Sequence, residues 1–168
     1  MVAGVEEAHT NTGEETMSGR TSSQGGTQIS REPIRIAALV VGVVFLVVGV
    51  MGFIPGLTTG YGRMQFAGHH SEAYLLGLFQ VSILHNLVHL VFGVAGVAMA
   101  RTAATARLFL VGGGVIYLVL WLYGLVIGYD SAANFVPLNG ADNWLHLGLG
   151  IGMLTLGFLL KPTDRAGR

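Results

Sequence analysis

Six polar residues stand in two otherwise apolar stretches of this chain, and their types and spacing suggest chemistry. They are His85, Asn86, His89, Asp142, Asn143 and His146. His85 and His89 are four residues apart, as are Asp142 and His146, so each pair would project from one face of a helix. Three imidazoles and one carboxylate from two facing helices match the ligands of a zinc, iron or manganese site. The spacing therefore predicts a common polar cluster and makes His85, His89, Asp142 and His146 candidate metal ligands.

Two other interpretations of the same residues remain open. His89 and His146 could be axial ligands of a b-type haem, with Gly93 and Gly150 one turn further along making room for the macrocycle. Alternatively, hydrogen bonds from Asn86 to His146 and from Asn143 to His89 would join two helix pairs without any ligand. Such bonds contribute about 0.6 to 2 kcal/mol each between helices in a membrane. We favour this structural interpretation over the ligand site and over a proton or solute path, for which polar side chains at membrane depth are also suited.

The composition indicates that the elements holding these residues lie in a bilayer. The chain has 168 residues, of which 52% are hydrophobic and 11% charged, with 26 glycines. Soluble domains carry about a quarter charged residues and roughly 7% glycine. The sequence has no cysteine, which excludes disulfides, thiolate metal sites and a cysteine nucleophile. Its formal net charge is zero, so no basic surface suggests a nucleic-acid partner.

Four apolar stretches follow a polar N-terminal region, and each has about the 20 residues that a helix needs to cross the hydrocarbon core. They lie near residues 36–54, 75–100, 106–129 and 143–160. We predict an all-α integral membrane four-helix bundle over residues 35–161, built from two tandem helical hairpins. Residues 1–34 are poor in large apolar side chains and are predicted to be a disordered tail, and residues 162–168 a second tail. Either Met1 or Met17 could be the natural start.

The basic residues predict how the bundle is oriented. Arg63 alone lies between the first two apolar stretches, whereas the other eight of the nine Lys and Arg residues lie at the opposite end. These eight are Arg20, Arg31, Arg35, Arg101, Arg107, Lys161, Arg165 and Arg168. Because basic residues are retained on the cytoplasmic side, both termini are expected in the cytoplasm.

An internal repeat relates the first two apolar stretches to the last two. Arg35, Gly42 and Gly52 recur 72 positions later as Arg107, Gly114 and Gly124, and Phe45 is matched by Tyr117. Asn86, His89 and Gly93 recur 57 positions later as Asn143, His146 and Gly150. Shared glycines are expected by chance in apolar sequence, but the recurring polar residues are not. We infer a tandem two-helix repeat whose halves are related by an axis along the membrane normal.

Two segments resemble the signature blocks of a known family. Residues 75–96 read L-L-G-L-F-Q-V-S-I-L-H-N-L-V-H-L-V-F-G-V-A-G, and residues 141–152 read A-D-N-W-L-H-L-G-L-G-I-G. Over residues 34–160 the chain is similar to domain of unknown function 4383, small bacterial membrane proteins predicted to have four helices. Ser82 departs from the family pattern, in which asparagine is expected, and this puts in doubt any role that needs an amide there. The resemblance implies a four-helix fold and a location in the inner membrane of a bacterial cell, but no activity.

These observations together predict a non-enzymatic membrane protein, a scaffold or partner subunit. Its partners would be the bilayer and either a second copy of the chain or another membrane protein. A redox protein that binds a transition metal or a b-type haem is the alternative, and a small transporter or proton path is the second alternative.

Overall fold

The structure, a computed structural model, describes residues 32–160. The predicted tails, residues 1–34 and 162–168, fall outside this range except for residues 32–34. Pro33 and Ile34 form the first turn of a helix rather than part of a tail. Proline at the first helical position has its φ already set for the helix, and Ile34 is fully buried, so the helix begins before the apolar stretch itself.

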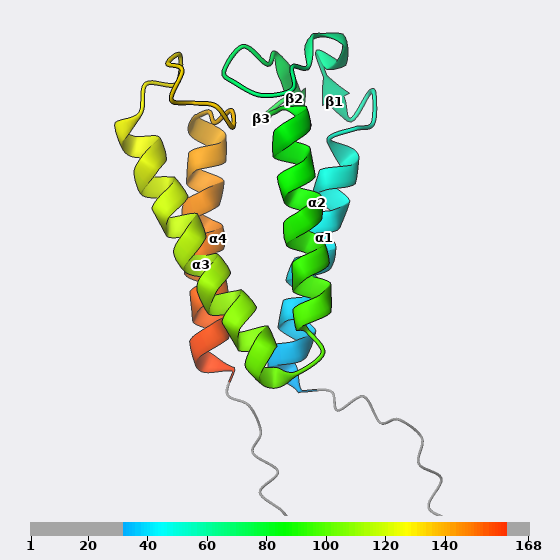
Figure 1. Ribbon diagram of the computed structural model, residues 1–168, viewed down its shortest axis with the longest axis vertical. Helices are drawn as coiled ribbons and strands as arrows, with labels where there is room; N and C mark the ends of the chain where they lie inside the picture. The colour runs from blue at the N-terminus through cyan, green and yellow to red at the C-terminus, as the bar shows by residue number, and fades with distance from the viewer. Residues whose placement is uncertain (1–31, 161–168) are drawn as a thin grey trace, which may run out of the picture. The chain divides into compact units, whose positions relative to one another are not determined.

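The described chain is mostly helical, with four α-helices. They are α1 (Pro33–Met51), α2 (Ile83–Met99), α3 (Ala103–Val126) and α4 (Gly140–Leu159). The helices pack mainly as two pairs, α1 with α2 and α3 with α4, and α1 also contacts α3 (Figure 1). Helices α1, α3 and α4 each begin three residues before the predicted stretch, because their capping residues precede the apolar run. Thr102 caps α3, and Asn139 forms a capping box with Asp142 at the start of α4.

Helix α2 corrects both a predicted boundary and the all-α fold class. We expected a helix from residue 75, but residues 73–81 form two strands of a small antiparallel sheet, β2 (Ala73–Leu75) and β3 (Phe79–Val81). Strand β1 (Thr58–Thr59) pairs with β2, giving the order β1-β2-β3. Between β2 and β3 the backbone turns through Leu76 and Gly77, which both have positive φ, 55° and 70°. Short apolar runs do not distinguish a strand from a helix by periodicity, which explains the wrong prediction.

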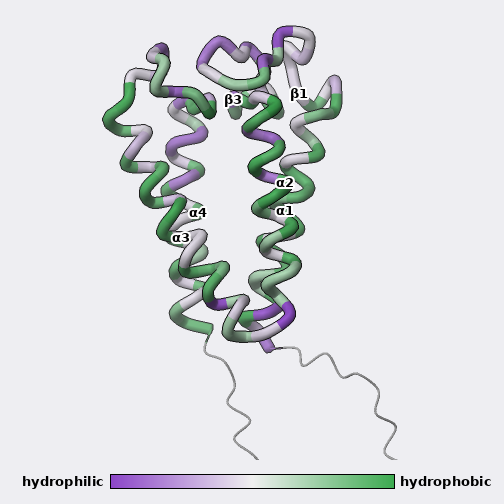
Figure 2. The backbone as a smooth tube through the Cα atoms, in the orientation of Figure 1, coloured by the Kyte–Doolittle hydropathy of each residue, from purple (hydrophilic) through white to green (hydrophobic). Residues whose placement is uncertain are grey.

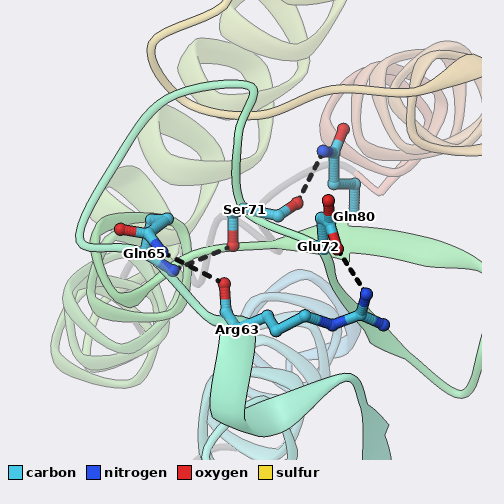
Figure 3. A network of polar contacts seen from close by, with 5 residues as sticks. All are labelled: Arg63, Gln65, Ser71, Glu72 and Gln80. Atoms are coloured by element: carbon cyan, nitrogen blue, oxygen red, sulfur yellow. Dashed lines mark hydrogen bonds and ion pairs between the residues drawn. The ribbon is translucent and has the colours of Figure 1, made fainter.

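Side-chain bonds attach this sheet to the loop before it (Figure 3). The Ser71 hydroxyl donates to the carbonyl of Val81 at 2.6 Å, and the Gln80 side-chain amide donates to the carbonyl of Ser71 at 2.8 Å. Arg63 and Glu72 form an exposed ion pair at 2.5 Å. The buried bonds position strand β3, whose last residue lies next to the N-cap of α2.

Aromatic rings connect the two helix pairs in the core. Phe45 of α1 stacks on Tyr117 of α3 with ring centroids 5.5 Å apart, and Phe92 of α2 packs edge-on against both rings. Such pairs contribute about 0.5 to 1.5 kcal/mol beyond the burial of their area. Phe45 and Tyr117 are related by the offset of 72 residues that the sequence comparison identified.

Two helices, α1 and α3, are long and apolar enough to cross a membrane, and α2 is a shorter apolar helix of 17 residues. Large apolar side chains are exposed along all four helices, including the two that do not meet this length and hydropathy criterion. They include Val43, Val47, Val91, Val94, Val119, Leu122, Ile151 and Phe158. Figure 2 shows hydrophobic residues along the length of the helices and hydrophilic ones concentrated toward the loops.

A buried histidine cluster between the two helix pairs

The structure buries all six residues that the sequence singled out. His85, Asn86 and His89 lie on α2, whereas Asp142, Asn143 and His146 lie on α4, and each is at most 9% exposed. Two cavities, of about 340 Å³ and about 100 Å³, border this region. His85, His89 and His146 line both cavities, so the imidazoles from the two helix pairs share one region. We call these three residues the histidine cluster.

Hydrogen bonds to backbone carbonyls determine which ring nitrogen carries the hydrogen in neutral His85 and His89. Their rings stack with centroids 4.7 Å apart. The Nδ1 of His85 lies 3.3 Å from the carbonyl oxygen of Pro137, and the Nδ1 of His89 lies 3.0 Å from that of His85. Because a carbonyl oxygen can only accept, each Nδ1 must carry the hydrogen. The Nε2 atom of each neutral ring therefore has a free lone pair.

The third imidazole, His146, is held differently. Its ring packs against Tyr117 with centroids 5.2 Å apart. Two side-chain atoms within residues 32–160 are fully buried and have no hydrogen-bond partner. They are the Nδ1 of His146 and the Oδ1 of Asn143. The Nε2 atoms of the histidine cluster have no partner in this range either, but they are not among the fully buried atoms. The Nε2 atoms are therefore partly accessible, and the three residues that carry them line both cavities.

Asp142 acts as a structural group. Its Oδ2 accepts one hydrogen bond from the backbone N–H of Asn139 and another from that of Gln80, each at 3.0 Å. The first bond belongs to the cap of α4, and the second joins α4 to strand β3. Ionised carboxylates at helix N-termini are stabilised by such donors. Asp142 therefore connects α4 to the sheet, whose strand β3 leads directly into the helix that carries His85 and His89.

The predicted metal quartet is brought together in space, but it is not arranged as a metal centre. Among the residues that the structure describes, no group of three or more His, Asp or Glu side chains is placed to hold a metal ion. The backbone bonds of the Asp142 carboxylate give a physical reason, because its Oδ2 is already engaged. The b-type haem stays a prediction that rests on the spacing of His89 and His146 alone.

The predicted hydrogen bonds of the two asparagines across the helix pairs are not formed. Each asparagine instead packs within its own pair, Asn86 against Gly52 at the C-cap of α1 and Asn143 against Gly124 of α3. A Cβ at either glycine would overlap the asparagine amide. The amide nitrogen of Asn86 contacts the sulfur of Met64 at 3.9 Å. The predicted bonds are not formed because glycine has no side chain, so each amide fits into the space beside the glycine of its own helix pair.

The remaining glycines make equivalent contacts in the two pairs. A Cβ at Gly93 would lie 2.7 Å from the backbone nitrogen of Leu46, and a Cβ at Gly150 would lie 3.1 Å from that of Leu118. Leu46 and Leu118 are themselves 72 residues apart. The same residue types therefore allow close backbone approach in both pairs.

Sequence reasoning did not identify several residues of the site. Tyr117 and Tyr123 line the larger cavity, and Pro137 supplies the carbonyl that orients His85. The sequence signal for Tyr117 is its match to Phe45 in the repeat. Ser82 caps α2 by accepting from the backbone N–H of His85 at 3.1 Å, a role that serine performs as well as asparagine.

The architecture is therefore that of a mostly helical protein in which two apolar helix pairs enclose buried imidazoles. The chain belongs to the family described as Domain of unknown function (DUF4383), whose model matches residues 35–159. No curated protein and no solved structure matches the chain.

Proposed function

We propose that the chain is an integral membrane protein that crosses the bilayer four times and acts without catalysing a reaction, as a scaffold or partner subunit. The exposed apolar side chains on all four helices support this proposal, because a monomer in water rarely exposes contiguous apolar area beyond a few hundred Å². In a bilayer the same side chains would contact acyl chains.

The basic residues support an orientation with both termini in the cytoplasm of a bacterial cell. The Nε of Arg35, in the first turn of α1, donates to the carbonyl of Ala100 at 3.0 Å, which joins the start of α1 to the end of α2. Arg101 and Arg107 flank the adjacent turn into α3, whereas Arg63 lies in the loop at the opposite end. By the positive-inside rule the end with three arginines is cytoplasmic.

The helix pairs are proposed to be two copies of one repeat, joined at their outer end by the histidine cluster and by Asp142. The single observation that carries this proposal is the bond from the Gln80 backbone N–H to the Asp142 carboxylate, buried between β3 and α4. The Nδ2 of Asn139 also donates to the carbonyl of Leu78, at 2.8 Å. The equivalent asparagine–glycine contacts in the two pairs support the repeat.

Replacing Asp142 with asparagine tests this joining role. The variant exchanges the carboxyl oxygen that accepts two backbone bonds for an amide, whose NH2 group cannot accept, and a net hydrogen bond contributes about 0.5 to 1.5 kcal/mol. We expect a clearly lower Tm of the purified full-length protein in detergent. Asp130→Asn is the matched control, because Asp130 is exposed, and its effect should stay within about 0.5 kcal/mol. Equal melting of the two variants would contradict the proposed role of Asp142.

A further inference from the structure

The larger cavity has the composition of a site for a small lipid-soluble molecule. Its volume is about 340 Å³, and its lining comes from α2, α3, α4 and the loop residues 135–138. Valine, leucine and phenylalanine side chains make up most of the lining, together with the histidine cluster, Tyr117 and Tyr123. Ligand sites typically combine such an apolar lining with a few polar groups that orient the ligand.

The cavity is continuous with the outer apolar surface of the helices. Three of its lining residues, Val88, Val119 and Phe135, are 47%, 58% and 59% exposed. In the proposed membrane orientation Val88 and Val119 would contact lipid. A molecule dissolved in the bilayer could therefore enter between α2 and α3 without crossing water.

The polar groups of the cavity define the chemistry of the molecule. The described residues that line it include no Asp, Glu, Lys or Arg, so a charged head would be desolvated without a partner, which is costly. The Nε2 atoms of His85 and His89 carry free lone pairs because both Nδ1 atoms donate to carbonyls. A neutral head that donates a hydrogen bond, as a hydroxyl does, fits these two acceptors.

We propose that this cavity binds one uncharged, lipid-soluble molecule with a hydroxyl-bearing head, and that His85 and His89 are the acceptors available to the hydroxyl groups of that head. The head of an acylglycerol and the ring of a quinol share this chemistry. The proposal rests on the membrane location proposed above, because only that location places the opening in lipid.

Binding of defined probes to the full-length protein in nanodiscs tests the proposal. The probes are radiolabelled 1-monooleoylglycerol and decyl-ubiquinol, and methyl oleate is the matched probe that lacks a donor. We expect saturable binding of one molecule per chain, and a raised Tm, for at least one hydroxyl probe. Methyl oleate should bind up to about tenfold more weakly, the equivalent of one net hydrogen bond. The hydroxyl probe that binds more tightly indicates the source of the natural ligand.

Two variants separate cavity binding from partition into the lipid. Val88→Trp fills the opening from a half-exposed position, so we expect normal folding and at least a tenfold loss of binding. His70→Gln changes an exposed histidine of the loop and should bind as the unmodified protein does. Equal binding of methyl oleate, or full binding by Val88→Trp, would overturn the proposal. If no probe binds while cysteine labelling places the loop between α3 and α4 and the first turn of α3 on opposite sides of the membrane, the ligand proposal is wrong and the membrane proposal stands.

Discussion

Single residues in this protein are oriented mainly by backbone groups. The carbonyls of Pro137 and His85 hold the imidazoles of His85 and His89, and backbone N–H groups hold the Asp142 carboxylate. Backbone partners of this kind fix a tautomer and a ring orientation without a second ionisable side chain. The chemistry available at the cavity is therefore that of neutral imidazole acceptors.

Leu76 is the residue whose backbone conformation is least suited to its type. Its φ is +55°, a left-handed conformation that costs a residue with a Cβ about 1 to 2 kcal/mol, and its side chain is 60% exposed. Leu76→Gly removes that cost but gives the unfolded chain more entropy, worth about 0.5 to 1 kcal/mol. We expect an unchanged or slightly raised Tm.

The control for Leu76→Gly is Leu78→Gly in the same turn, because Leu78 is 54% exposed and does not have a positive φ. Leu78→Gly should lower the Tm, since it adds only the entropy of the unfolded state. If Leu76→Gly lowered the Tm as much as Leu78→Gly does, the left-handed conformation would not carry the cost that we assign to it.

At the scale of elements, glycine and asparagine together set how closely the helices of each pair approach. Gly52 leaves room for the Asn86 amide, and Gly124 leaves room for that of Asn143. The length of the apolar stretches predicted four helices, and the repeat predicted their pairing. The strands were not predictable, because the turn at Leu76 needs a positive φ that the side chain does not favour.

Substitution of these glycines tests the packing of the elements. Gly52→Ala and Gly124→Ala each place a Cβ into an asparagine side chain, and overpacking of this kind typically costs about 1 to 3 kcal/mol. We expect similar losses of Tm in both variants, because their surroundings are equivalent. Gly148→Ala is the matched control within a helix, since nothing lies within 4 Å of the added Cβ. It should leave the Tm unchanged or raise it, as alanine favours helix by about 1 kcal/mol over glycine. A tolerated alanine at Gly124 would contradict the equivalence of the two pairs.

At the scale of the whole molecule, the proposed topology determines which solvent each part of the protein meets. The apolar helix surfaces would meet lipid, the arginine-rich end the cytoplasm, and the sheet with its Arg63–Glu72 ion pair the outer face. The cavity then lies toward the outer half, where the carbonyl of the loop residue Pro137 orients His85, one of its lining residues.

Cysteine labelling tests this topology directly, because the sequence contains no cysteine. Ala132→Cys lies in the loop between α3 and α4, and Ala104→Cys lies in the first turn of α3, and both positions are exposed. A membrane-impermeant maleimide added to intact bacterial spheroplasts should label Ala132→Cys alone, and disrupted membranes should allow both to react. Labelling of both variants in intact spheroplasts would contradict the proposed four crossings.

The sequence alone determined the family, the mostly helical class and the six buried polar residues, because apolar stretches and polar residues within them are visible in the order of the chain. It could not determine which atoms these side chains use. Whether an asparagine bonds across the helix pairs or fills the space above a glycine depends on distances that arise only when helices pack. The tertiary structure decided that point, and it also decided the tautomer of His85, because the carbonyl that orients His85 comes from a residue 52 positions away.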